Sequence, residues 1–142
     1  MARIKLALPE KFQFETEINI RITDINYGGH LGNDSVLAFI HEARVRLLNH
    51  HGFSELDAGA GTGMIQSDAL IVFKNEAFYG ESVIAKVAVT EISRNSCDFV
   101  FQLLDKESGR EITRAKTGIV FFNYSDRKIS KTPDEFRKIF GS

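Results

Sequence analysis

The fold depends most on one long stretch, residues 33–52, whose sequence is NDSVLAFIHEARVRLLNHHG. Apolar residues recur in it every three or four positions, as they do on the buried face of an α-helix. Residues 33–35 are candidate N-caps and Gly52 is a typical C-terminal stop, so we expect the helix to end near His51. Its first half is apolar on every side, which predicts that other structure covers it. The residues at helical spacing are Val36, Ile40, Ala43 and Leu47.

Strand patterns flank this helix on both sides. From Phe12 to Ile22 the even positions are mostly apolar and the odd positions polar, which is typical of a half-buried strand. Further along, Thr132 and Glu135 have the spacing of a capping box, which predicts a short helix over 133–140. Four other stretches have strand character: residues 64–75, 81–92, 96–104 and 111–123. This order predicts one α+β domain over residues 1–142, with a five-stranded antiparallel sheet curled around the long helix and a short C-terminal helix.

The composition is that of an ordinary globular domain. The chain has 142 residues, of which 43% are hydrophobic and 26% charged, and its net charge of −1 favours neither nucleic acid nor a membrane surface. Its one cysteine, Cys97, cannot form an intrachain disulfide and alternates with Phe99 and Phe101, which predicts a core position. No stretch has the length of a membrane span or the spacing of a metal site. We therefore expect a cytoplasmic protein without a metal, a nucleic-acid partner or a membrane partner.

A motif just before and within the helix carries the clearest functional signal. Residues 24–34 are DINYGGHLGND and residues 40–44 are IHEAR. Together they resemble the hotdog-fold acyl-CoA thioesterases of the 4-hydroxybenzoyl-CoA thioesterase type, whose pattern is Asp-x-Asp-x-x-Gly-His-x-x-Asn-Asn, then Glu-Ala-Arg on a helix. The resemblance implies a hotdog fold and hydrolysis of an acyl-CoA, with no cofactor besides the coenzyme A of the substrate. It also implies a homodimer or a dimer of dimers with active sites between subunits.

One position departs from the family pattern. Asn26 stands where the family has its usual catalytic aspartate, and an amide is neither a general base nor a nucleophile. We therefore expect Asp24 to act as base or nucleophile, with Asn26 and His30 polarising the thioester or positioning water. Backbone N–H groups at the start of the helix suit the negative charge that develops on the thioester oxygen. The structural alternatives are that Asp24 caps the turn and that His30 bonds a backbone carbonyl.

A second set of residues is expected to contact the substrate. Asn33 and Asp34 have the alternative role of capping the helix, and Glu42 has that of pairing with Arg46 one turn later. Arg94 is a candidate for the phosphates of coenzyme A, which need cations. The expected substrate-binding residues are Tyr27, Gly29, Asn33, Asp34, Glu42 and Arg94.

These patterns predict an acyl-CoA or acyl-carrier thioesterase that holds the thioester carbonyl at the N-terminus of the central helix. Two alternatives stay open. A hotdog hydratase would use Asp24 and His30 as a dyad that adds water to an enoyl thioester, and it would consume a crotonyl thioester without releasing thiol. An acyl-CoA-binding protein without activity would account for Asn26, and it would bind thioesters without turnover.

Overall fold

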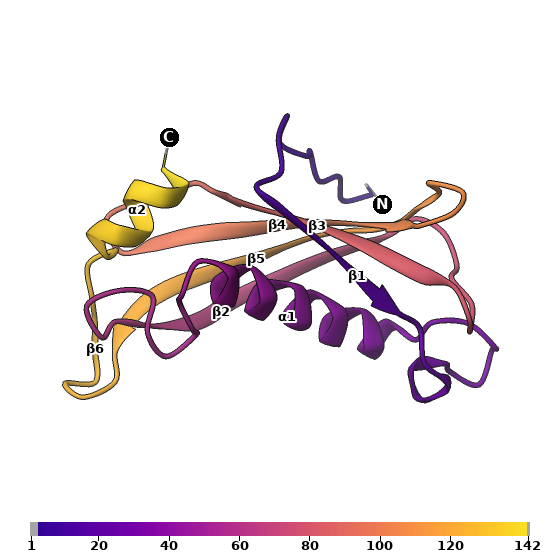
Figure 1. Ribbon diagram of the computed structural model, residues 1–142, viewed down its shortest axis with the longest axis horizontal. Coiled ribbons are helices and arrows are strands. Elements are labelled where there is room, and N and C mark those ends of the chain that lie inside the picture. Colours follow the sequence, from indigo (N-terminus) through magenta and orange to yellow (C-terminus); the bar gives the residue numbers. More distant parts are fainter. Residues whose placement is uncertain (1–2, 142) are drawn as a thin grey trace.

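Figure 1 shows the computed structural model, which describes residues 3–141 and has one long helix lying along a face of an antiparallel sheet. The helix is α1 (Asn33–His50), preceded by the 3-10 helix η1 (Ile22–Asp24). The main strands are β1 (Phe14–Asn19), β2 (Gly63–Phe73), β3 (Ser82–Thr90), β4 (Ser96–Asp105) and β5 (Glu111–Asn123). They are ordered β1-β3-β4-β5-β2, and β6 (Lys128–Ile129) adds to β5. The predicted α+β architecture is confirmed, and β6 is an addition to it.

The core lies between α1 and the sheet face that it covers. From α1, Ile40, Ala43 and Leu47 are at most 1% exposed, which confirms the helical spacing read from the sequence. Cys97 is buried as predicted, and burial raises the pKa of its thiol to about 12. In the described residues, no helix combines the length and the apolar character needed to cross a membrane. The fully buried residues of β3 and β4 are Val83, Ala85, Val87, Phe99, Phe101 and Leu103.

The start of α1 differs from the prediction. Its N-cap is Gly32, not one of residues 33–35, and no side chain caps the helix there. Gly32 donates its N–H to the Asp24 carbonyl oxygen at 3.0 Å, and a Cβ at this position would lie 2.6 Å from Oδ1 of Asp34. The Asp34 side chain therefore lies close against Gly32 where the loop meets the helix, and the first backbone N–H groups of α1 receive no side-chain cap. At the other end, Gly52 has a φ of +78°, which confirms it as the helix stop.

The bounds of the first strand and the exposure of α1 also differ from the prediction. The first strand covers Phe14–Asn19 and not residues 12–22, because its ladder with β3 extends only from the Phe14–Val87 pair to the Asn19–Ser82 pair. The exposed side of α1 is less covered than predicted, since Leu37 is 44% exposed.

The C-terminal helix forms as predicted, but its capping box does not. Helix α2 (Asp134–Phe140) has Pro133 as its N-cap, and the hydroxyl of Thr132 donates instead to the Ser93 carbonyl at 2.7 Å. This bond ties α2 to the turn between β3 and β4. Phe136 anchors the helix, since it is fully buried with its ring 5.1 Å from that of Phe121.

Candidate active site

The loop that leads into α1 is held by Asp24. Its carboxylate accepts hydrogen bonds from the backbone N, Nε and Nη2 of Arg21 at 2.9, 3.2 and 3.1 Å. Burial alone would raise the pKa of this carboxyl, but the hydrogen bonds from Arg21 outweigh that effect and hold its pKa below the ordinary value. Asp24 is only 5% exposed, and both of its oxygens contact Arg21. Asp24 therefore caps the turn formed by residues 21–24, which is the structural alternative named for it from the sequence.

Asn26 folds the next part of the loop. Its side-chain Oδ1 accepts from the backbone N–H of Gly28 at 2.9 Å and of His30 at 3.4 Å. The backbone N–H of Asn26 donates to the His30 carbonyl at 2.9 Å. This is the Asx-turn geometry that Asn and Asp share, so an amide fills the structural role of the usual aspartate. Gly29 has a φ of +82°, which a residue with a side chain rarely adopts. The loop thus fixes the backbone on which His30 is placed.

His30 lies between two oxygen atoms. Its Nδ1 is 3.3 Å from the Leu31 carbonyl oxygen, and its Nε2 is 3.7 Å from Oε1 of Glu76. When Nδ1 carries the proton and donates to Leu31, Nε2 is left with a free lone pair. The His30 side chain is 30% exposed and that of Glu76 is 63% exposed, so solvent has access to this pair.

A pocket of about 190 Å³ opens beside His30. It lies where the start of α1 meets the end of β2, the segment that follows β2, and the first residues of β5. Its polar lining includes His30, Asn33 and Glu76, and its apolar lining includes Leu31, Val36 and Ile112. The loop is joined to this segment by the Leu31 N–H, which donates to the Ala77 carbonyl at 2.7 Å. The pocket therefore combines an apolar wall with a polar mouth.

The N-terminus of α1 borders the same pocket. The first helical hydrogen bond is from the Val36 N–H to the Gly32 carbonyl at 3.1 Å. Among the described residues, the N–H groups of Asn33, Asp34 and Ser35 have no acceptor. Such N–H groups, at the positive end of the helix dipole, stabilise negative charge. An imidazole, a carboxylate and N–H groups that are free to bind an anion therefore lie together at the pocket.

The family of this chain follows from its sequence. A family model described as the thioesterase-like superfamily matches residues 20–140. The chain belongs to this superfamily. The match contains the loop, α1 and every strand after β1, so it includes all residues that line the pocket.

Solved structures show which fold this superfamily member has. The 1,4-dihydroxy-2-naphthoyl-CoA thioesterase from Synechocystis is 20% identical, with 91% of this chain and 96% of that one covered and a TM-score of 0.81. The 12:0-ACP thioesterase from Umbellularia californica is 18% identical, with 90% of this chain and 49% of that one covered and a TM-score of 0.77. No curated protein sequence matches the chain. The likeness confirms the predicted hotdog fold.

The predicted site residues of this thioesterase-like protein include some that line the pocket, some that shape the loop behind it and some that lie elsewhere. His30 and Asn33 line the pocket, and Asp24 and Asn26 shape the loop behind it. Tyr27 is fully exposed at the tip of that loop. Because Asp24 bonds Arg21 and His30 faces Glu76, the Asp24–His30 dyad of a hydratase is not formed.

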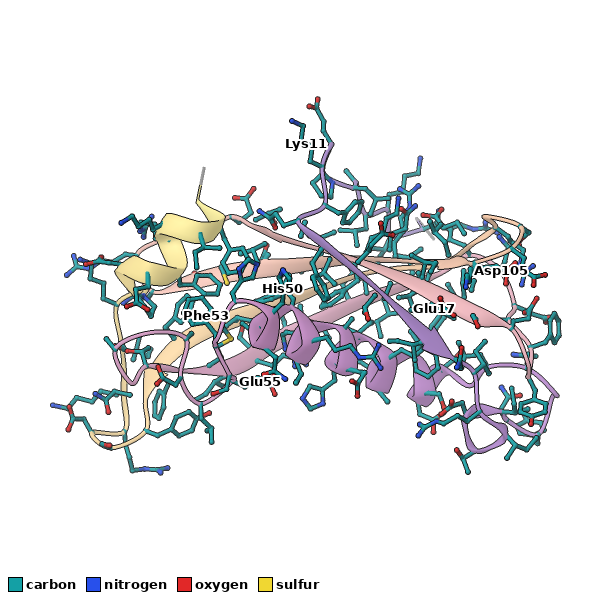
Figure 2. All side chains as sticks on the ribbon, viewed as in Figure 1. Lys11, Glu17, His50, Phe53, Glu55 and Asp105 are labelled. Carbon is teal, nitrogen blue, oxygen red and sulfur yellow. The ribbon has the colours of Figure 1, made fainter. Side chains whose placement is uncertain are left out.

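Glu42 and Arg94 are not brought to the pocket. Glu42 accepts from Nε of Arg46 at 2.8 Å, the pairing named as its structural alternative. Arg94 lies in the β3–β4 turn, where its carbonyl accepts from the Thr132 N–H at 2.7 Å. This turn is next to α2, beyond the C-terminal end of α1, and α1 is about 27 Å long. In Figure 2, His50 marks that end of the helix and Asp105 marks the opposite end of the sheet.

Sequence reasoning missed Glu76 and Thr113, which line the pocket. The available signal for Glu76 was the polar cluster Lys74-Asn75-Glu76 directly after an apolar strand. Nothing local to that cluster indicates that it meets the start of α1, because this contact depends on how β2 and α1 pack in three dimensions.

Proposed function

We propose that the chain hydrolyses the thioester of a small acyl-CoA or acyl-carrier substrate, with the thioester carbonyl at the N-terminus of α1. The observation that carries this proposal is the approach of His30 Nε2 to Glu76 Oε1, 3.7 Å apart, at the mouth of the pocket. Membership of the thioesterase-like superfamily supports the same reaction class.

Water is the nucleophile in this proposal. We propose that a water molecule donates one O–H group to each of these two acceptors, after a small widening of their separation, and so turns its lone pairs toward the substrate. As the water oxygen attacks the carbonyl carbon, one proton passes to the free lone pair of His30 or to Glu76. Asn26, which cannot serve as a base, is then not required to do so.

The carbonyl oxygen becomes negatively charged during the attack. The N–H groups of Asn33 and Asp34 are the donors that stabilise it. Because the fold already orients them, no free energy is spent on reorienting them as the charge develops. When the tetrahedral intermediate collapses, the C–S bond breaks and the proton taken from water goes to the thiolate. The products are a carboxylic acid and a free thiol, and no cofactor takes part.

The remaining predicted residues receive supporting roles. Asp24, Asn26 and Gly29 hold the loop, while exposed Tyr27 and Asp34 are placed to contact the part of the substrate outside the pocket. Lys74, which lines the pocket and is exposed, is a cation for the phosphates of coenzyme A. A cytoplasmic location stays a prediction.

We also propose that two copies of the chain pair through β2. Within the described residues, the outer edge of β2 has no partner strand, and Ile65 and Phe73 on it are 39% and 50% exposed. A long, apolar, unpaired edge favours pairing with a second copy. Antiparallel β2–β2 pairing would bring the α2 end of one copy toward the α1 start of the other, which is how Arg94 would approach a neighbouring substrate. Glu42 stays away from that contact, because its partner Arg46 bonds Thr16 and Glu17 of β1 at the opposite edge of the sheet.

Thiol release tests the reaction. Wild-type protein, His30→Ala and the control His50→Ala are mixed with acetyl-, butyryl-, benzoyl- and lauroyl-CoA, and free thiol is followed with a chromogenic reagent. We expect release by wild type and His50→Ala, and about a hundredfold lower kcat for His30→Ala. No release from any thioester, with measurable binding of one, would instead favour the acyl-CoA-binding alternative.

A further inference from the structure

One buried hydroxyl makes no hydrogen bond within the described residues. Thr113 lies on β5, is 0% exposed, and its Oγ1 has no hydrogen-bond partner. It is the one buried side-chain oxygen or nitrogen among residues 3–141 of which this is true. A buried hydroxyl without a partner destabilises a folded chain, and valine would fill the same space without that cost. Such a group calls for a physical explanation.

Thr113 belongs to the wall of the pocket beside His30. Its neighbours in that wall include Leu31, Val36 and Ala77, which offer no polar side-chain atom. Among the side chains of this wall, the Thr113 hydroxyl is the single polar group, whereas a buried water molecule needs two to four polar partners. A ligand with an apolar body and one well-placed oxygen fits such a wall better than water does.

A second residue of the pocket lies next to Thr113 on the neighbouring strand. Phe73 is the direct partner of Thr113 in the β2–β5 ladder, and paired residues point to the same face of a sheet. Phe73 also lines the pocket and is 50% exposed, so it marks the side of the pocket from which an acyl group would reach Thr113.

We propose that Thr113 is a specificity residue that binds a hydroxyl or keto oxygen on the acyl group of the substrate. This rests on the proposed thioesterase function. The thioester carbonyl lies at the polar mouth by His30 and Asn33, and the body of the acyl group lies against the apolar wall. Because a cavity of about 150 Å³ holds one benzene ring, the pocket of about 190 Å³ suits a single ring or a short chain.

Matched substrates test the proposal. We compare kcat/KM for the three ring-hydroxylated benzoyl-CoA isomers with benzoyl-CoA, and for 3-hydroxybutyryl- and 3-oxobutyryl-CoA with butyryl-CoA. The wild type is expected to prefer an oxygen-bearing member of at least one series by about tenfold or more. The hydroxyl and keto arms show whether Thr113 accepts or donates, since it is able to do both.

Variants then assign the preference to Thr113. Thr113→Val is expected to abolish the preference and to keep the wild-type melting temperature or raise it, while Thr113→Ser retains the preference. The control is Thr117→Val, on the same strand, whose hydroxyl only contacts Nη1 of Arg44 at 3.5 Å. It should leave the preference intact.

Two results would overturn the proposal: a wild type that prefers the unsubstituted acyl groups, or a preference that survives in Thr113→Val. If no thioester is hydrolysed, the proposed function fails separately. Binding of free hydroxybenzoates and benzoate is then measured by calorimetry with wild type and Thr113→Val. Equal affinity of the wild type for both acids would reject the role of Thr113 without reference to catalysis.

Discussion

Nε2 of His30 and Oε1 of Glu76 lie 3.7 Å apart, although one residue precedes α1 and the other follows β2. Both atoms are acceptors when the neutral imidazole carries its proton on Nδ1 and the carboxylate is ionised. Neither atom then donates to the other, and a water molecule is able to donate to both. The two residues are also beside the free N–H groups of α1 and the pocket. In the proposed reaction, Glu76 takes the place of the carboxylate that Asn26 does not provide.

The space around His30 predicts the effect of a single methyl group. A Cβ on Gly28 would lie 3.3 Å from Oδ1 of Asn26 and 3.4 Å from Nε2 of His30. We therefore expect Gly28→Ala to displace the ring and to lower kcat/KM by about tenfold or more, because small misplacements of reacting groups are costly. The melting temperature should change little, since Gly28 is exposed. Steady-state kinetics and a thermal melt on the same preparation check this, and an unchanged kcat/KM would contradict it.

Asp24 should show its role in the acid stability of the fold. Its pKa in the folded chain is below its ordinary value of 3.8, so its ionised form stabilises the fold above that pH and the contribution is lost as the pH falls through the folded pKa. We expect Asp24→Asn to lower the free energy of unfolding by about 1–2 kcal/mol at pH 7.

The difference between Asp24→Asn and wild type should shrink below pH 3.8, the ordinary value of this carboxyl. Urea unfolding at pH 7 and at stepwise lower pH measures it. The control Glu107→Gln, an exposed residue of the β4–β5 turn, should change stability by less than about 0.5 kcal/mol. A pH-independent difference would be the contrary result.

Arg44 is a buried charged residue whose hydrogen bonds are expected to stabilise the fold. It is 5% exposed and donates from Nε to Oε2 of Glu55 at 2.8 Å and from Nη1 to Gln66 at 3.2 Å. Burial alone would raise the pKa of the Glu55 carboxyl, but hydrogen bonds from His41 and Arg44 hold it below the ordinary value. Because Arg44→Ala leaves Glu55 without this partner, we expect a loss of about 2–3 kcal/mol.

Chemical denaturation of Arg44→Ala, Glu55→Gln and Arg44→Ala/Glu55→Gln measures the coupling. The double variant should be less destabilised than the sum of the two single ones, because removing both charges leaves neither unpaired. Strict additivity would mean that the pair does not act as a unit.

Phe136 is expected to hold α2 against the rest of the domain. It is fully buried, with ring centroids 5.1 Å from Phe121 and 4.7 Å from Phe140. Phe136→Ala is expected to cost about 3–5 kcal/mol, as for other buried aromatic residues. The matched control is Ile139→Ala, since Ile139 is 41% exposed on the same helix. Equal losses for the two variants in urea unfolding would show that α2 is not anchored by Phe136.

The sequence predicted the fold well where the pattern was long and periodic. The spacing of Val36, Ile40, Ala43 and Leu47 located α1, and the alternation in residues 96–104 located β4. Local capping signals were less informative. Thr132 has the right spacing for a capping box, but a carbonyl on a distant turn competes for its hydroxyl.

The sequence predicted only some of the residues of the candidate site. His30 and Asn33 follow from the motif and from their position at the start of α1. Glu76 and Thr113 belong to elements far along the chain, and they join the pocket only because β2 and β5 pair with one another beside α1. The motif also drew attention to Asp24, whose bonds to Arg21 are visible only in three dimensions.

The most direct measurement compares two carboxylates. Initial rates of thiol release are recorded for Glu76→Gln, Asp24→Asn and the control Glu107→Gln, on the best acyl-CoA and well below the melting temperature of each variant. We predict that Glu76→Gln lowers kcat by about a hundredfold, while Asp24→Asn and Glu107→Gln stay within about threefold of wild type. Loss of turnover in Asp24→Asn with full turnover in Glu76→Gln would contradict the assignment of Glu76 and return the catalytic role to Asp24.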